Sequence, residues 1–260
     1  MKKKTLRALA IGCHPDDIEF MMSGTLFLLK EQGAELFYMN VADGGCGTQE
    51  YSTEEICAIR KEEAKKASSY LGAAWFKSIA HDMEVVFDMK LVRKVAAVMR
   101  EVDPSIILAP SLYDYMEDHM NTARIVSTAA FTIGMPNFVT DPVRPILHRE
   151  IALYHALPYG LQDAYQRPVI PHFLVDVSSV MKRKTAMLSL HDSQRNWLDS
   201  SQKIDSYVET MQNMCHEVGS IYSHQYQFAE GWIRHNPLGY SNPQYKPLEK
   251  ALRGSWEQVH

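Results

Sequence analysis

The stretch that decides the fold is residues 5–17, which read T-L-R-A-L-A-I-G-C-H-P-D-D. The part up to glycine 12 is short and mostly apolar, as is typical of a buried strand. The C-H-P-D-D that follows is a polar turn. It leads directly into 18–32, where apolar residues recur at helical spacing until a glycine at 33. The sequence therefore predicts a strand, a charged turn and one helix at the start of the chain.

The same alternation continues over about the first 110 residues. We expect further strands at 34–42, 73–79 and 105–109. We expect helices at 52–72, which opens with the capping-box sequence S-T-E-E, and at 89–102. Short apolar strands between amphipathic helices predict an α/β fold of the Rossmann-like, doubly wound type, with a mostly parallel sheet and helices on both faces.

The pattern is less regular in the second half of the chain. The expected strands are 150–157, 172–177 and 228–233, and the expected helices are 180–190 and 203–218. The tail from Asn236 is predicted to be irregular, and its aromatic residues either cover the sheet edge or meet another subunit. We expect a single domain over 1–260, with a Rossmann-like core over 1–135. Residues 136–260 would complete it and supply substrate-side and oligomer contacts.

Composition narrows the class of protein. The 260 residues suit one α/β domain or at most two small ones, and a hydrophobic fraction of 46% is ample for a buried core. A net charge of −4 gives no electrostatic reason to expect nucleic acid or an anionic membrane as partner. The four cysteines form no C-x-x-C pair and fit free thiols in a reducing compartment. With no signal peptide or apolar span apparent, we expect a cytoplasmic protein.

Ionisable residues follow two of the expected strands. His14, Asp16 and Asp17 come directly after the first strand, and burying three such groups is costly unless a cation compensates them. The strand at 105–109 leads to Asp118 and His119. Because the carboxyl ends of parallel strands share one edge of a sheet, these groups should converge there as a His/Asp/His set suited to Zn²⁺. Each motif alone also suits a structural turn, but their joint placement favours a metal site.

At these residues the chain resembles the LmbE-like, or PIG-L-type, zinc-dependent N-deacetylases, which remove acetyl or related acyl groups from amino sugars. The family pattern A-H-P-D-D-E compares with G-C-H-P-D-D-I-E over 12–19. Weaker matches follow in family order, and these are Asp43-Gly44-Gly45, Arg60-x-x-Glu63 with Leu71-Gly72, Asp118-His119, Lys184 with His191-x-Ser193-Gln194, and Phe228-Ala229-Glu230.

The resemblance implies a role for each matching residue. The implied metal ligands are His14, Asp17 and His119, holding Zn²⁺ or, alternatively, Fe²⁺ or another divalent ion. The implied catalytic residues are Asp16, as the general base for attack by a metal-bound water, and Asp118, beside the ligand imidazoles. The implied substrate contacts are Arg60, Asp82 and Tyr113. Residues 43–48 lack the G-x-G-x-x-G spacing of a phosphate loop, so we expect a loop that flanks the site.

One position departs from the family. Its second motif is commonly H-x-D-H, whereas residues 116–119 read M-E-D-H. The missing histidine is thought to stabilise the charged intermediate or to protonate the leaving amine, and methionine can do neither. Three explanations stay open. Tyr113 or Tyr115 donates to the oxyanion, another histidine such as His191 enters the site, or the protein has an altered substrate or weak activity.

The function expected from these observations is hydrolysis of an acyl group, with acetyl expected, from the nitrogen of an amino sugar such as an N-acetylglucosamine derivative. Alternatives are hydrolysis of another amide or conjugate, a catalytically silent metal-binding protein, and a nucleotide-binding protein, against which the absent glycine fingerprint argues. The expected partners are a small-molecule substrate and further copies of the chain, as a trimer or a hexamer.

Overall fold

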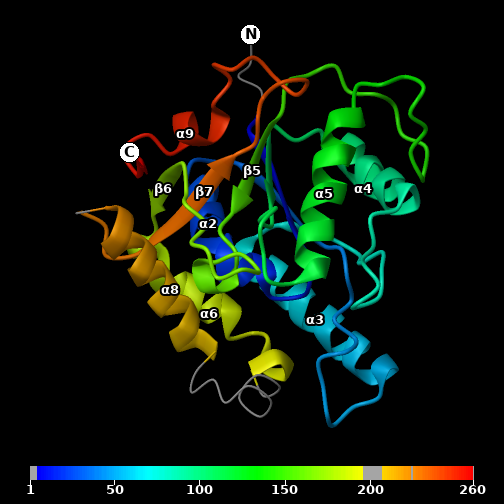
Figure 1. The fold of residues 1–260 in the computed structure, drawn as a ribbon. Coiled ribbons are helices and arrows are strands. Elements are labelled where there is room, and N and C mark those ends of the chain that lie inside the picture. The colour runs from blue at the N-terminus through cyan, green and yellow to red at the C-terminus, as the bar shows by residue number, and fades with distance from the viewer. Residues whose placement is uncertain (1–4, 196–206, 224, 260) are drawn as a thin grey trace.

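The strands of the computed structural model, which describes residues 5–195, 207–223 and 225–259, form one sheet of eight strands. Figure 1 shows this sheet between two layers of helices. The strands are β1 (Arg7–Gly12), β2 (Glu35–Asn40), β3 (Ala74–Phe76), β4 (Ile106–Ala109), β5 (Ala152–Ala156), β6 (Phe173–Asp176), β7 (Ala229–Arg234) and β8 (Trp256–Gln258). Their spatial order is β3-β2-β1-β4-β5-β7-β6-β8.

The sheet has a parallel and an antiparallel part. β1 pairs in parallel with β2 and β4, β2 with β3, and β4 with β5. This is the Rossmann-like α/β arrangement that the sequence predicted, and it puts the carboxyl ends of β1 and β4 side by side. The less regular second half adds β7, antiparallel to both β5 and β6, and β8, antiparallel to β6. The sheet is therefore mixed.

The helices cover both faces, as predicted. They are α1 (Asp17–Met21), α2 (Ser23–Glu31), α3 (Thr53–Leu71), α4 (Met89–Val102), α5 (Glu117–Thr132), α6 (Met181–Leu188), α8 (Tyr207–Tyr222) and α9 (Pro247–Ala251), with short 3-10 turns η1 (Tyr159–Leu161) and η2 (Ser178–Val180). Leu9 and Ile11 of β1 pack with α4 and α5, whereas Ala8 and Ala10 pack with the other helices, since side chains alternate along a strand. Among the described helices, none combines the length and apolar composition needed to cross a bilayer.

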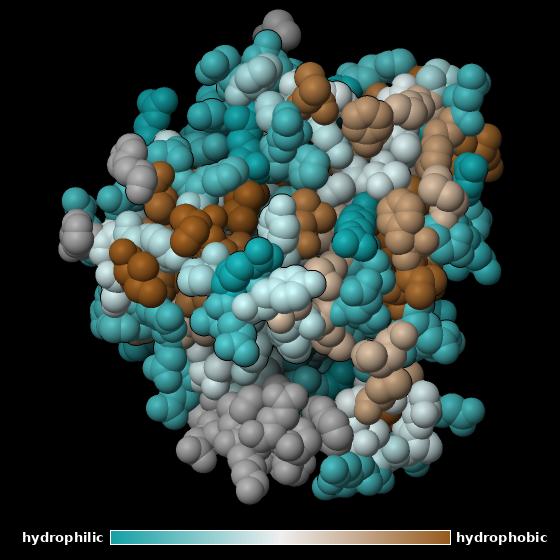
Figure 2. Space-filling model, in the orientation of Figure 1, coloured by the Kyte–Doolittle hydropathy of each residue, from teal (hydrophilic) through white to brown (hydrophobic). Residues whose placement is uncertain are grey.

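The hydrophobic side chains at the surface do not form one continuous patch on the face that Figure 2 shows. There they lie in separate patches among hydrophilic residues. That face resembles the mixed surface usual in globular proteins, where single exposed hydrophobic residues are common.

Helix α3 begins and ends as its sequence predicts. The Ser52 hydroxyl accepts a hydrogen bond from the Glu55 amide, and the Glu55 carboxylate accepts one from the Ser52 amide. This is the predicted capping box, which satisfies two amides that the first turn leaves unpaired. Gly72 ends the helix at φ 72°, a left-handed conformation that glycine adopts without penalty.

The single helix predicted over 18–32 is wrong, because the chain breaks at Met22 into α1 and α2. The Lys184 ammonium lies inside the break and donates to the carbonyls of Glu19 and Phe20 at 3.1 and 2.8 Å. Those carbonyls would otherwise accept from amides four residues later in a continuous helix. A side chain inserted into the helical ladder is a known cause of such breaks.

On the α2 side of the break, a buried carboxylate binds the free backbone amides. Glu230 accepts from the amides of Gly24 and Thr25 at 2.8 Å each, at the start of α2. It also accepts from Lys184 Nζ at 2.6 Å, and both charged side chains are almost fully buried. An anion at a helix N-terminus is favoured by unpaired amides and by the helix dipole. Lys184 and Glu230 therefore tie the second half of the chain to the helices that follow β1.

The tail predicted to be irregular contains two further elements, so that prediction is wrong. α9 begins at Pro247, and β8 adds an edge strand beside β6. Trp256 of β8 packs edge-on against Phe173 with ring centroids 5.9 Å apart. Trp256 therefore has the first of the two roles considered for the aromatic tail, because it covers the sheet edge. The helix predicted over 203–218 is observed from Tyr207, while residues 203–206 lie outside the described part of the chain.

Candidate metal centre and active site

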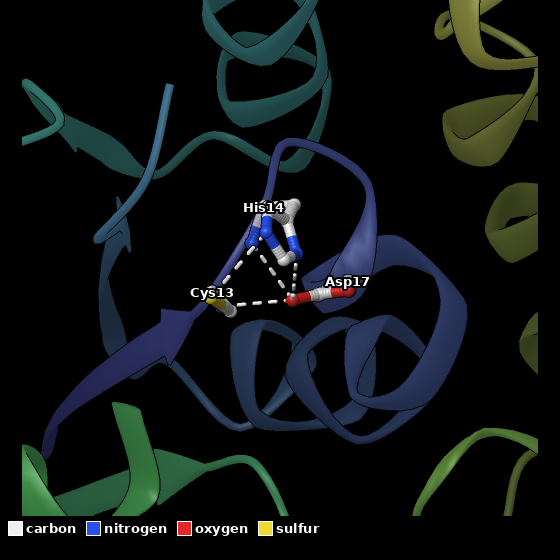
Figure 3. A group of neighbouring side chains, drawn as sticks. All are labelled: Cys13, His14 and Asp17. Atoms are coloured by element: carbon white, nitrogen blue, oxygen red, sulfur yellow. Dashed lines mark hydrogen bonds and ion pairs between the residues drawn. The ribbon is translucent and has the colours of Figure 1, made fainter. Parts of the chain in front are cut away.

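The turn after β1 is held by one carboxylate. Asp17 Oδ2 accepts from the amides of Cys13 and His14, each at 2.8 Å, and Figure 3 shows this carboxylate reaching back toward both residues. Asp16 adopts φ 110° and ψ −24°, in the left-handed region that side chains other than glycine rarely enter. This conformation turns the chain from β1 into α1 and places His14, Asp16 and Asp17 together, each no more than 8% exposed.

His119, the third residue of α5, meets this turn from the end of β4. Its Nε2 lies 3.3 Å from His14 Nδ1 and 3.5 Å from Asp17 Oδ1, and His14 Nδ1 lies 3.9 Å from Asp17 Oδ2. Ligand atoms at 2.0–2.2 Å from a tetrahedral Zn²⁺ are separated by about 3.3–3.6 Å. The three side chains have two separations in this range, whereas the third, from His14 to the other oxygen of Asp17, is longer. Their assignment as ligands stays a prediction, which this spacing supports.

The other nitrogen of His14 faces two carboxylates. Nε2 lies 3.1 Å from Asp82 Oδ1 and 3.5 Å from Asp118 Oδ2. These three residues form one of two described groups with donor atoms close enough for a metal, and the other group is Cys13, His14 and Asp17. If Nδ1 faces the metal, Nε2 is left to donate to Asp82, as ligand imidazoles commonly do to a carboxylate. Burial alone would raise the pKa of Asp82, but the hydrogen bond and charge of His14 outweigh it, and the pKa is lowered.

Asp118 and Asp82 occupy related positions. Asp118 Oδ2 accepts from the Met83 amide at 2.8 Å, and Asp82 Oδ2 accepts from the Cys46 amide at 3.0 Å. Asp118 therefore lies beside a predicted ligand imidazole, as the sequence suggested. Asp82 lines the pocket and also contacts His14, so its predicted substrate contact stays a prediction.

Asp114 was not predicted. Its Oδ1 lies 3.2 Å from His119 Nδ1 and also accepts from the Met116 amide at 3.0 Å. It therefore contacts the second ring nitrogen of His119 as Asp82 contacts that of His14, and it lies five residues earlier, in the loop before α5. The available signal was that a ligand histidine needs an acceptor for its second nitrogen.

The charge of this cluster also points to a cation. Five buried carboxylates lie in or beside it, and these are Asp16, Asp17, Asp82, Asp114 and Asp118. A buried set of mostly negative groups is unfavourable unless positive charge compensates it. This supports a divalent ion held by residues of this turn and of α5.

The Asp16 carboxylate contacts α8. The Tyr207 hydroxyl donates to Asp16 Oδ2 across 191 residues of sequence. Burial raises the pKa of Asp16 to about 6, and the charge of Asp17 adds to that rise, while His191, Arg60 and the Tyr207 hydrogen bond oppose it. A carboxyl group with such a pKa can both take and return a proton near neutral pH. No pattern in the sequence singled out Tyr207.

The pocket over this site has a volume of about 240 Å³ and a partly aromatic wall that includes Phe20, Tyr115 and Tyr159. Tyr115 packs edge-on against His119 with centroids 5.9 Å apart. Tyr113 is 61% exposed and lies outside this lining, so its predicted substrate contact stays a prediction. Met116 forms part of the wall.

Arg60 reaches the same pocket from α3 and is only 2% exposed. Its Nε and Nη2 have no hydrogen-bond partner among the described residues. The glycine-rich loop makes room for it, since a Cβ on Gly44 would lie 2.4 Å from Nη1 and one on Gly47 would lie 2.9 Å from Nη2. Buried polar groups are almost always paired, so this guanidinium is available to an acceptor on a ligand.

His191, considered as a substitute for the missing histidine, does not line the pocket, although its charge acts on Asp16. It is 1% exposed, its Nε2 lies 3.3 Å from Glu19 Oε1, and it is absent from the pocket lining. Glu19 also accepts from the Tyr38 hydroxyl at 2.9 Å. Among the described residues, the imidazoles that line the pocket are those of His14 and His119.

Comparison with known proteins gives consistent matches. The family profile described as PIG-L, GlcNAc-PI de-N-acetylase, matches residues 9–130. The diacetylchitobiose deacetylase of Thermococcus kodakarensis is 27% identical over 195 residues, covering 72% of this chain and 70% of the relative. A probable N-acetyl-alpha-D-glucosaminyl L-malate deacetylase 2 of Bacillus anthracis is 25% identical over 203 residues, covering 74% and 83%.

Solved structures share the fold. The N,N'-diacetylchitobiose deacetylase from Pyrococcus horikoshii superposes with a TM-score of 0.72 at 22% identity, covering 94% of this chain and 89% of its own. The 4-carboxy-2-hydroxymuconate hydratase from Pseudomonas putida KT2440 also gives 0.72 at 22% identity, covering 90% and 97%. The family profile and the sequence relatives, together with the H-P-D-D turn, show that the chain belongs to the PIG-L, or LmbE-like, deacetylase family.

Proposed function

We propose that this protein is a metal-dependent hydrolase that removes an acyl group, expected to be acetyl, from the nitrogen of an amino sugar or its conjugate. The observation that carries the proposal is the convergence of His14, Asp17 and His119 at one sheet edge, with the Asp16 carboxylate beside them. The sequence relatives carry the names of deacetylases that act on such sugars.

The metal would be held by His14, Asp17 and His119, with Zn²⁺ expected and Fe²⁺ an alternative. When bound, it would supply a Lewis acid that polarises the amide carbonyl and makes water more acidic. Asp82 and Asp114 keep the two imidazoles oriented through the ring nitrogens that face away from the proposed ion.

Asp16 is the proposed general base. It lines the pocket next to the ligand Asp17, and the hydrogen bond from Tyr207 fixes the direction of its carboxylate. In this position it takes a proton from the attacking water and can pass it to the leaving amine. Since Met116 cannot donate a proton, the transfer to the amine falls to Asp16 in this chain.

Two further groups are proposed to bind the substrate. Tyr115 lines the pocket, and because a tyrosine hydroxyl is protonated at neutral pH it can donate to the developing oxyanion. Arg60 offers two unpaired N–H groups to a sugar hydroxyl or a carboxylate of the conjugate. We retain the predictions of one domain over 1–260 and of a homo-oligomer.

A second candidate reaction is the addition of water to an unsaturated carboxylate. Met116 removes the leaving-group acid that amide cleavage uses, and the unpaired Arg60 suits a carboxylate. One structural neighbour is a hydratase of a carboxylated substrate. This reaction needs the same metal residues and the same base but no leaving amine.

The deciding experiment measures acetate released from N-acetylglucosamine and N,N'-diacetylchitobiose. Zinc-loaded protein should release acetate, a chelator should stop the release, and added Zn²⁺ should restore it. The Asp16→Asn variant, which should keep its zinc, serves as the matched control for contaminating activity. If loaded protein leaves both substrates intact yet removes the ultraviolet absorbance of a carboxylated diene, the hydratase candidate replaces the deacetylase.

A further inference from the structure

We infer that a second binding site, for an organic phosphate, lies in a groove at the edge of the sheet. The groove has a volume of about 600 Å³, larger than the pocket over the metal centre. Its walls come mainly from α3, from β3 with the segment 77–81 that follows it, and from α4, and Pro15 is also in the lining. It shares no lining residue with the active-site pocket, since the groove is lined by Pro15 and the pocket by His14, Asp16 and Asp17 of the same turn.

The groove carries unpaired positive charge. Lys61 lies on α3, Lys77 in the segment after β3 and Lys94 on α4, and none forms a hydrogen bond or ion pair with a described residue. Asp43 is the one carboxylate in the lining, and its Oδ2 is already engaged 2.7 Å from His81 Nδ1. Three ammonium groups around one hollow, in a chain whose net charge is −4, form a local field that attracts anions.

The other carboxylate oxygen of Asp43 also accepts hydrogen bonds. Asp43 Oδ1 accepts from the amides of Gly45 and Asp82, each at 3.1 Å. The carboxylate therefore binds the loop beside the metal centre and places one negative charge against three ammonium groups. The groove lining keeps a net positive charge.

An aromatic ring stands beside the charges. Trp75 of β3 lines the groove and is only half-buried, and Ile79 and Ala80 extend its apolar surface. Lys65 Nζ lies 5.3 Å from the centre of the Trp75 ring, which holds one side of the indole by a cation–π contact. A half-buried indole next to ammonium groups suits a ligand that joins a ring to an anion.

These features together specify the ligand class. Ammonium groups bind phosphate as point charges, and an indole face stacks against a nucleobase or the C–H face of a sugar. A nucleoside diphosphate and a sugar phosphate share this combination. The inference concerns binding alone, so it stands or falls separately from the proposed hydrolysis.

The test is isothermal titration calorimetry on zinc-loaded protein with inorganic pyrophosphate, UDP and glucosamine 6-phosphate. All three should bind saturably and more weakly as the salt concentration rises. The two ring-bearing probes should bind more tightly than pyrophosphate, and whichever of them is tighter identifies the kind of ring. The Trp75→Ala variant should weaken these two probes while leaving pyrophosphate unchanged.

A charge-matched pair of variants locates the site. In K61Q/K77Q/K94Q the affinity for pyrophosphate should fall by about tenfold or more, the sum of three modest ion pairs. The control K66Q/K90Q/K182Q removes the same charge from exposed lysines outside the groove and should keep its affinity. Acetylation of intact protein followed by mass spectrometry should show UDP protecting the first set of lysines and not the second.

Three results would overturn the inference. One is the absence of saturable binding by any probe. Another is equal binding by the two triple variants, which would assign the anion to the metal centre or to Arg60. The third is a change in oligomeric state of the groove variant in light scattering, which would make the groove a contact between copies of the chain. A melting temperature for each variant excludes unfolding as a cause.

Discussion

The buried pair between α6 and β7 allows a quantitative prediction. Lys184 is fully buried and donates to Glu230, to the Glu19 carbonyl and to the Phe20 carbonyl. The Lys184→Met substitution keeps most of the apolar volume of the side chain but removes all three hydrogen bonds. We expect this one change to loosen the junction between α1 and α2, and with it the position of Asp17.

The magnitude follows from what the substitution leaves behind. Glu230 would keep the amides of Gly24 and Thr25 but would lose its only cationic partner among the described residues. Removing one member of a buried ion pair typically costs about 3–5 kcal/mol. The Glu19 carbonyl keeps the Ser23 hydroxyl as a donor at 2.7 Å, so we add nothing for it. The expected loss in free energy of unfolding is about 4 kcal/mol.

Urea denaturation followed by circular dichroism measures this loss. The matched control is Lys182→Met, an exposed lysine on the same helix, which should change stability by no more than about 0.5 kcal/mol. In the double variant Lys184→Met/Glu230→Gln no unpaired charge remains. Its loss should therefore be smaller than the sum of the two single losses, by about 1–3 kcal/mol.

Two results would refute this reasoning. One is a Lys184→Met protein within about 1 kcal/mol of the parent, since that lies at the level of an ordinary substitution. The other is strict additivity in the double variant, which would mean that the two side chains do not stabilise the fold as a pair. The zinc content of the same preparations reports on Asp17, and we expect it to fall together with stability.

Three further predictions concern single residues. Asp16→Asn should keep its zinc and lower kcat for acetate release by about 10²–10⁴, and a fully active variant would exclude Asp16 as the base. His119→Ala should lower the zinc content found by elemental analysis, and an unchanged content would remove it from the ligand set. Burial lowers the pKa of His155 to about 4, so the unfolded chain binds a proton that the folded chain does not as the pH falls below about 6.5. The free energy of unfolding should therefore fall by up to about 3 kcal/mol between about pH 6.5 and about pH 4. Urea denaturation midpoints at about pH 7.5 and about pH 4.5 measure this fall, and it should be smaller in the His155→Gln variant. The same pH dependence in parent and variant would contradict this account.

The parallel half of the fold was predictable because its signals are local. The capping box at Ser52 and the glycine at 72 bound α3, and the apolar spacing of Met89–Val102 gives α4 its observed limits. The break at Met22 was not predictable, because its causes lie far along the chain. Lys184 and Glu230 reach it across 164 and 206 residues of sequence.

The candidate site also contains residues that the sequence predicts and residues that it does not. His14, Asp17 and His119 follow two strands of the parallel sheet, and parallel pairing of β1 with β4 suffices to bring them together. Tyr207 reaches Asp16 only through the packing of α8, which no pattern near the turn encodes. Asp114 was missed for another reason, since a carboxylate in a loop has many equally plausible partners until the ring it faces is fixed.

The backbone of Asp16 has a consequence for how this position can change during evolution. At φ 110° most side chains would be strained by about 1–3 kcal/mol, and asparagine, aspartate and glycine are the residues that best tolerate such a conformation. Position 16 therefore admits few residue types even before any chemistry is considered. Glycine would relieve the strain but lose the carboxylate, so Asp16→Gly should resist urea better than the parent while it no longer turns over substrate. At this one residue, selection for activity and selection for stability favour different amino acids.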